Sequence, residues 1–167
     1  MSTLSVDTIQ GKTTAGTVAM PAGMVVQTSF HTFSTETALG TNSDADIGGS
    51  SHTFTPKFAS SLLILSTSLH IHINRSSSNE GGTYNFVVDG VNISHASEDY
   101  EHYINMNSGN TNVYMRSHKE VSVNASNTNA KTIKLVGRPH DINNSGVFRI
   151  NAYGNFISSI KVQEITQ

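Results

Sequence analysis

The sequence predicts an all-β fold, an antiparallel jelly-roll-like β-sandwich of about ten strands. Two observations carry this prediction. Apolar and polar residues alternate in many short segments, whereas no window shows the apolar spacing of a surface helix. Ser, Thr and Asn make up about a third of the 167 residues and charged residues only 13%, and small polar residues with few charges suit the surface of a sheet.

The chain is organised around residues 60–74, which read SSLLILSTSLHIHIN. A period of two is typical of a strand with one face in a core, and at about 3.3 Å per residue this strand would cross the whole domain. The core face is predicted to carry Leu63, Leu65, Thr67, Leu69, Ile71 and Ile73. The other face starts with Leu62 and Ile64 and ends with His70 and His72. We therefore expect this face to be buried against another subunit at its apolar beginning and solvent-exposed at the histidines.

The chain divides into an extended N-terminal attachment arm, residues 1–23, and one β-sandwich domain, residues 24–167. The arm is rich in Gly, Thr and Ala, and its large apolar side chains are too few to make a core. Main-chain pairing and side-chain docking would attach such a segment to neighbouring proteins. The candidate docking residues are Leu4, Val6, Ile9, Val18 and Met20.

Strands are predicted on both sides of the central stretch. Residues 24–33 and 52–55 have strand patterns, and a loop rich in Gly, Asn and Asp separates them. Residues 76–82, SSSNEGG, are expected to be a loop. Residues 83–94 give the strongest local prediction, a β-hairpin with Asp-Gly as a two-residue type I′ turn. That turn sets the pairs Val88 with Val91, Phe86 with Ile93 and Tyr84 with His95.

Six further strands are expected in the second half of the chain. They are residues 99–106, 111–116, 120–124, 131–137, 147–156 and 158–165. The third and fourth of these are expected to pair around the polar loop SNTNA. In that arrangement Val121 and Val123 face Ile133 and Leu135.

Composition excludes several classes of function. The formal net charge is −2 and no run of Lys or Arg occurs, so we expect neither nucleic acid nor an anionic membrane as a partner. No cysteine is present, so no disulfide or thiolate metal site is available. The N-terminus lacks the charged and apolar regions of a signal peptide, and no apolar run is long enough to insert in a membrane. We expect the protein to be made in a cytoplasm and to stay soluble there.

Short motifs in a fixed order resemble a domain common at the C-terminal ends of tail-fibre and other virion appendage proteins of marine bacteriophages, especially those that infect cyanobacteria. The motifs are LSVDTIQ near the start, VAMPAGMVVQ at 18–27, TPKFASSLLIL at 55–65, NFVVDGVNIS at 85–94, TIKLVG at 132–137 and ISSIKVQEI at 157–165. The resemblance implies a jelly-roll-like sandwich that acts as a homotrimer at the surface of a virion. It implies other virion proteins as partners, and a host surface glycan or protein as the target.

The resemblance leaves the place in the virion open. Family members are usually the tips of longer fibres with their own shaft, which favours a tail-fibre or tail-appendage subunit. A domain with only a short arm also fits a capsid decoration protein. A third alternative is a sugar-binding receptor-recognition module. In the tail, the loops at residues 76–82, 107–110 and 126–130 are the candidate receptor contacts.

His70 and His72 are the candidate metal ligands. They are one residue apart on a strand, so their side chains project in the same direction about 6.6 Å apart. Three chains meeting on a threefold axis would place six imidazoles around a transition metal such as iron, nickel or zinc. His-X-His motifs that bind iron are known from some phage fibre tips, and the resemblance makes such a site more plausible here. The alternative is two half-exposed histidines on the polar side of the strand, with no cofactor.

The densest charged and aromatic segment is SEDYEHY at residues 97–103. Its acids Glu98, Asp99 and Glu101 are candidate Ca²⁺ ligands, and Tyr100 and Tyr103 are candidates for stacking on a sugar ring. Strand alternation would divide these ligands between two faces, which favours a solvated strand instead. Catalytic motifs such as G-x-S-x-G and H-E-x-x-H are absent, and the few acids lie mostly in turns, so we expect no enzyme activity.

Overall fold

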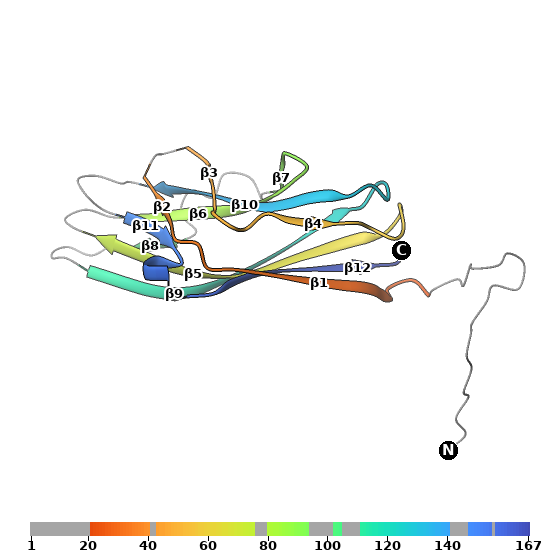
Figure 1. Ribbon diagram of the computed structural model, residues 1–167, viewed down its shortest axis with the longest axis horizontal. Coiled ribbons are helices and arrows are strands. Elements are labelled where there is room, and N and C mark those ends of the chain that lie inside the picture. Colours follow the sequence, from red (N-terminus) through yellow and green to blue (C-terminus); the bar gives the residue numbers. More distant parts are fainter. Residues whose placement is uncertain are drawn as a thin grey trace, which may run out of the picture.

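A computed structural model describes residues 21–40, 43–75, 80–93, 102–104, 111–140, 147–154 and 156–167. These residues are almost entirely β-structure, and two antiparallel sheets lie against each other as two layers (Figure 1). The predicted all-β sandwich is therefore confirmed. Among the described residues, no helix is long and apolar enough to cross a membrane.

The first sheet is built on the central strand. Its six strands are β1 (Val25–Phe33), β2 (Thr37–Leu39), β5 (Leu62–Arg75), β9 (Thr111–Asn124), β11 (Val147–Ile150) and β12 (Ser158–Ile165). β9 pairs with one edge of β5 along its whole length. The other edge of β5 pairs with β12 in its first half and with β11 in its second half. β1 continues the sheet beside β12, and β2 continues it beside β11.

The second sheet is built on two central strands. Its six strands are β3 (Ala45–Asp46), β4 (His52–Phe54), β6 (Glu80–Val88), β7 (Val91–Ile93), β8 (His102–Ile104) and β10 (Lys131–His140). β10 pairs with β6 on one side and with β3 and β4 on the other. The outer edge of β6 carries β7 and β8.

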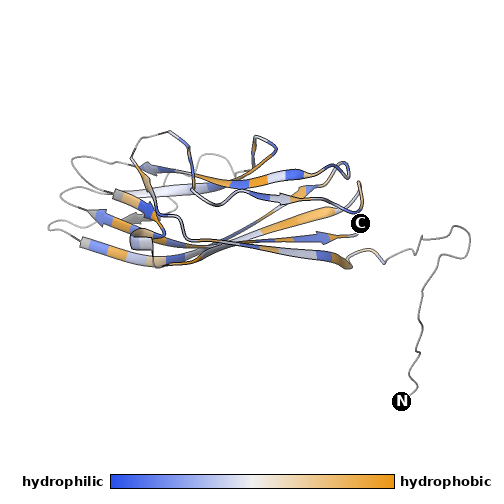
Figure 2. Ribbon diagram, viewed as in Figure 1, coloured by the Kyte–Doolittle hydropathy of each residue, from blue (hydrophilic) through white to orange (hydrophobic). Residues whose placement is uncertain are grey.

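The core lies between the two sheets. Hydrophobic and hydrophilic residues alternate along the strands, as predicted (Figure 2). All the predicted inward residues of β5 are buried, as are Phe148 and Ile150 of β11 and Ile160 and Val162 of β12. Full burial of one such Leu, Ile or Phe side chain contributes about 1.5–3 kcal/mol to stability. Because these residues come from strands far apart in the sequence, the core ties the whole chain together.

The hairpin prediction is confirmed. Asp89 and Gly90 have φ values of 50° and 83°, the left-handed pair that a type I′ turn requires. β6 and β7 pair as expected, with Val88 opposite Val91 and Phe86 opposite Ile93. The third expected partner, His95, lies outside the described residues.

The prediction that residues 120–124 pair with residues 131–137 is wrong. Residues 111–124 form one strand, β9, of 14 residues, because β5 is equally long and its free edge needs a partner of the same length. β10 lies in the other sheet. Val121, Ile133 and Leu135 therefore belong to one core but come from different sheets, instead of lying beside each other in one sheet.

The loop predicted at residues 76–82 is also partly wrong, because β6 begins at Glu80. A Cβ atom at Gly82 would lie 2.8 Å from the Phe148 ring, so glycine is needed here for sheet packing and not for a turn. The short strands β2 and β3 lie in the segment predicted as loop between residues 33 and 52. They bring the strands in the described chain to twelve instead of about ten.

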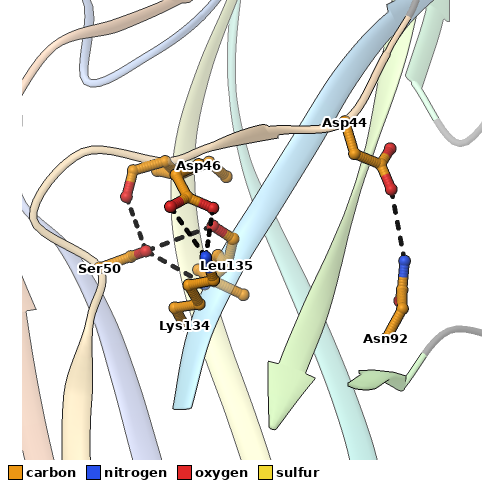
Figure 3. A network of polar contacts seen from close by, with 7 residues as sticks. Asp44, Asp46, Ser50, Asn92, Lys134 and Leu135 are labelled. Atoms are coloured by element: carbon orange, nitrogen blue, oxygen red, sulfur yellow. Dashed lines mark hydrogen bonds and ion pairs between the residues drawn. The ribbon is translucent and has the colours of Figure 1, made fainter. Parts of the chain in front are cut away.

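The segment around β3 is fastened to β10 by polar contacts (Figure 3). Lys134 Nζ lies 2.6 Å from Asp46 Oδ1, although both side chains are partly exposed and such a pair adds little stability. Ser50 is buried, and its hydroxyl accepts from the Leu135 N–H at 3.1 Å and donates to the Ile47 carbonyl at 2.7 Å. Ser50 thus pairs main-chain groups that the short strands leave without partners.

The two ends of the described chain lie together. The Gly23 N–H donates to the Thr166 carbonyl at 2.8 Å, and the Thr166 N–H donates to the Met24 carbonyl at 3.0 Å. The C-terminus and the start of β1 share one end of the sandwich, and β2, β8 and β11 lie at the other (Figure 1). The predicted attachment residues Leu4, Val6, Ile9, Val18 and Met20 lie outside the described residues.

Candidate functional site

The two histidines of β5 lie on the outer face of the first sheet, on the same side, as the alternation predicts. The expected exposure of the histidines is wrong, because His70 is 8% exposed and His72 1% exposed. Leu62 and Ile64 at the other end of the strand are partly exposed in the single chain, and their burial against another subunit stays a prediction. An outward-facing residue becomes buried only when other side chains cover it. The covering side chains therefore define a feature that the sequence pattern did not show.

Aromatic rings cover both histidines. Phe156 stacks on His70 with ring centroids 3.5 Å apart and planes within 5°. Tyr114 of β9 stacks on His72 at 4.4 Å and 10°. Tyr153 completes the group, 6.5 Å from Tyr114 and tilted by 41°. We call Tyr114, Tyr153 and Phe156, with the two histidines below them, the aromatic patch.

A chain of side-chain hydrogen bonds holds the patch on one side. The Asn112 amide oxygen accepts from His72 Nε2–H at 3.0 Å and from Asn74 Nδ2–H at 2.7 Å. Asn112, Tyr114 and their partners face outward together, because β5 and β9 pair His72 with Tyr114 and Asn74 with Asn112. The Nδ1 atoms of His70 and His72 are buried and have no hydrogen-bond partner among the described residues.

The surroundings shift the pKa values of two members of the patch. Burial lowers the pKa of His70 below its ordinary value of 6.5, and the nearby charges of Arg116 and His72 lower it further. The pKa of Tyr114 is raised, first by its hydrogen bond with the Tyr153 side chain and then by loss of water contact. His70 is therefore neutral at pH 7, and the hydroxyls of Tyr114 and Tyr153 are linked.

Tyr153 is held in an unusual backbone conformation. Asn151, Tyr153 and Gly154 have φ values of 53°, 64° and 64°, which is left-handed backbone that residues with a Cβ atom rarely adopt. The Tyr153 N–H donates to Glu36 Oε2 at 2.8 Å, and Glu36 Oε1 accepts from Arg149 at 3.1 Å. The turn thus lifts Tyr153 out of the surface, where it is 57% exposed.

Asn151 anchors this turn from below. Its side chain is fully buried, accepts from the Ser158 hydroxyl at 2.6 Å and donates to the Phe33 carbonyl at 3.3 Å. The Asn151 N–H donates to the His70 carbonyl at 3.0 Å, and the His70 N–H donates to Ser158 Oγ at 3.0 Å. The same network therefore fixes the turn and the strand that carries the histidines.

The residues present fit a transition metal only in part. His70 and His72 are imidazole donors on one face, but the described residues contain no group of three or more His, Cys, Asp or Glu side chains that would hold a metal ion. Phe156 and Tyr114 lie over the two rings, so a metal shared on a threefold axis would require these aromatic rings to move. The threefold metal site stays a prediction.

A second buried polar site lies at the opposite end of β5. Glu164 of β12 is 0% exposed, and its carboxylate accepts hydrogen bonds from the Lys57 and Phe58 N–H groups, the Ser61 hydroxyl and the Gln27 amide, at 2.6–2.9 Å. Burial by itself raises the pKa of a carboxyl, but these four donors outweigh it and the pKa of Glu164 lies below its ordinary value. This carboxylate is a structural group that holds the turn before β5.

The sequence pattern did not indicate that the three rings of the aromatic patch lie together. Tyr114 lies on the strand predicted at residues 111–116. Alternation puts Tyr114 and Arg116 on the same face of that strand, but it does not show what Tyr114 covers. Tyr153 and Phe156 were assigned to a strand, although β11 ends at Ile150. The three acids proposed as Ca²⁺ ligands all lie outside the described residues. They are Glu98, Asp99 and Glu101, and Tyr100 also lies outside.

Comparison with known proteins gives no assignment. No model of a known protein family matches the chain, and no curated protein matches it either.

Proposed function

We propose that the protein is a structural subunit of a bacteriophage virion, most plainly of a tail fibre or tail appendage. In this role it assembles as a homotrimer through its sandwich and is attached through residues 1–23. It works by assembly and not by catalysis.

One observation carries the proposal: two motifs of the resemblance meet in space. Glu164 belongs to ISSIKVQEI, and its carboxylate accepts from the backbone of Lys57 and Phe58 and from the Ser61 hydroxyl, all in TPKFASSLLIL. The motif residues are about a hundred positions apart but form one unit with a charged group at its centre. The two motifs therefore depend on each other in the fold. This supports the interpretation that they belong together to one kind of domain.

The strand order supports the jelly-roll-like part of the proposal. Along one sheet the main strands follow the order β1, β12, β5, β9, and along the other β4, β10, β6, β7. From β2 to β11 the chain crosses between the two sheets six times, before β3, β5, β6, β9, β10 and β11, and such repeated crossing supports a Greek-key type of sandwich.

Exposed apolar side chains support an assembly of several subunits. Phe30 of β1 is 70% exposed, and Met24, Val25 and Ile157 are also exposed. Burying such groups against another subunit would contribute about 25 cal/mol per Å². The attachment arm would leave from the end of the sandwich where Gly23 pairs with Thr166, and the aromatic patch lies toward the other end (Figure 1).

The test has two parts. Light scattering of the purified chain should give the mass of a trimer, and Phe30→Ser should shift the mass toward monomer while thermal unfolding stays cooperative. Antibody labelling of virions should mark the tail at low copy number, and a variant without residues 1–20 should fold but not be incorporated. A monomer and unlabelled virions would overturn the proposal, while labelling all over the capsid would favour the decoration role.

A further inference from the structure

We propose that the aromatic patch, together with the amides of Asn74 and Asn112, is a binding site for a neutral oligosaccharide. This inference goes beyond the proposed function and does not depend on it, because the site lies within one chain and needs no virion partner.

The Tyr114 ring is held in an orientation that suits sugar binding. A tyrosine on the outer face of a strand usually stands away from the sheet, but Tyr114 lies flat on His72, with planes 10° apart. One face of its ring is thus occupied, while Tyr114 as a residue is still 47% exposed. A fixed ring face with little rotamer freedom to lose suits stacking against the C–H face of a sugar ring.

Two side-chain amides, those of Asn74 and Asn112, lie beside the Tyr114 ring and can bind sugar hydroxyls. The Asn112 oxygen already accepts two hydrogen bonds, which fixes the side chain and leaves its Nδ2–H₂ group with no partner among the described residues. The Asn74 amide nitrogen is used in the same contact, and its oxygen has no partner within that part of the chain. A free donor and a free acceptor therefore lie next to each other on the face that carries Tyr114. Two adjacent sugar hydroxyls offer the complementary acceptor and donor.

A turn with left-handed backbone holds Tyr153 beside Tyr114. Two residues with a Cβ atom, Asn151 and Tyr153, are held in left-handed backbone within three positions. Such conformations persist only where surrounding contacts enforce them, and they are concentrated at ligand sites. Here the contacts are the buried amide of Asn151 and the carboxylate of Glu36. Their joint effect is to hold a second exposed tyrosine 6.5 Å from Tyr114 at an angle of 41°.

The chemistry of the surroundings favours a neutral sugar over a charged ligand. Near the two tyrosines, Arg149 is paired with Glu36, and Arg116 donates to the Ser68 hydroxyl and the Ile157 carbonyl. The carboxylate of Glu36 balances the charge of Arg149, and the exposed Arg116 guanidinium keeps N–H donors that a sugar hydroxyl could accept, beside the two rings and the two amides.

The test is binding of defined neutral tetrasaccharides to the intact chain. The probes are cellotetraose, chitotetraose, maltotetraose, laminaritetraose and mannotetraose, titrated up to about ten times a dissociation constant of about 1 mM. The chain has five tyrosines and no tryptophan, and two of the five are in the patch, so a change in tyrosine fluorescence measures binding and calorimetry is the second measurement. We expect at least one probe to bind saturably.

Variants locate the binding. Tyr114→Ala should weaken it at least about tenfold, and Tyr114→Phe, which keeps the ring, should leave it within about threefold. Asn112→Asp keeps the oxygen that accepts from His72 and Asn74 but removes the free donor, and should cost about tenfold. Phe58→Ala is the matched control, since Phe58 is 41% exposed at the opposite end of β5, and it should bind as the parent chain does.

Two results would overturn the proposal. One is the absence of saturable binding for all five sugars. The other is binding that Tyr114→Ala and Asn112→Asp leave unchanged while circular dichroism shows both variants folded. A trimer that persists while sugar binding fails would remove this inference and leave the proposed virion role intact, so the two are tested separately.

Discussion

Phe156 lies flat on His70, with the two ring centroids 3.5 Å apart and the planes within 5°. This contact removes a histidine on the outer face of a sheet from water, and burial is the main reason why the pKa of His70 lies below 6.5. The patch is therefore a small second core on the outside of the sandwich, and its stability depends on His70 staying neutral.

Phe156→Ala should raise the pKa of His70 toward 6.5, because water would reach the ring. It should also cost about 1 kcal/mol of stability through the lost stacking. The measurement is an NMR titration of the imidazole protons. Phe156→Leu keeps an apolar cover and is the control, so a pKa that rises equally in both variants would contradict burial as the cause.

The same pKa shift predicts a pH dependence of folding. Since the folded-state pKa of His70 is lower than the unfolded value of 6.5, the unfolded chain takes up the proton first as the pH falls. The free energy of unfolding should therefore be highest above pH 6.5 and decrease between 6.5 and the folded-state pKa. Urea unfolding at a series of pH values measures it. His70→Gln should flatten this part of the profile, and an unchanged slope would assign the effect to other histidines.

Glu164 should control stability in acid. Its pKa is lower in the folded state than the ordinary 4.5, so its contribution is complete above that pH and is lost as the pH falls through the folded-state value. Glu164→Gln should remove this acid-dependent part. It should also cost about 3 kcal/mol near pH 7, because an amide cannot accept from all the donors around it. Equal acid dependence in Glu164→Gln and the parent chain would show that another carboxyl is responsible.

The sequence was sufficient to predict those parts of the fold in which a local pattern of residues allows only one geometry. Alternation placed the inward residues of β5, and Asp89-Gly90 set the register of its hairpin, because few sequences allow left-handed backbone at two successive positions. Pairing between distant strands was not predictable: Val121 and Val123 fit a partner in the same sheet or across the core equally well. The aromatic patch was missed because its rings come from β9 and from the turn after β11, which only the fold brings over His70 and His72.

Gly82 should tolerate no side chain. A Cβ atom there would lie 2.8 Å from the Phe148 ring and 2.9 Å from the Arg138 carbonyl oxygen, and neither can move freely in the buried sheet. Gly82→Ala should therefore destabilise the protein by about 1–3 kcal/mol through overpacking. Gly40→Ala is the matched control, since a Cβ atom at Gly40 has no atom within 4 Å, and it should be close to neutral. Similar unfolding midpoints for the two variants would contradict the predicted packing of β6 on β11.

Substitutions at Asn151 distinguish two contributions to the stability of the strained turn, that of the side-chain hydrogen bonds and that of the left-handed backbone. Asn151→Gly removes the bonds to Ser158 and Phe33 but suits a φ of 53°, and it should cost about 2 kcal/mol. Asn151→Ala should cost about 1 kcal/mol more, because Ala is strained in left-handed backbone. At Thr28, an exposed position in β1, the order should reverse, with Ala more stable than Gly. If Ala is as stable as Gly at position 151 in thermal unfolding, the backbone is not strained there, and the tyrosine at position 153 is not held out by the turn in the way the patch requires.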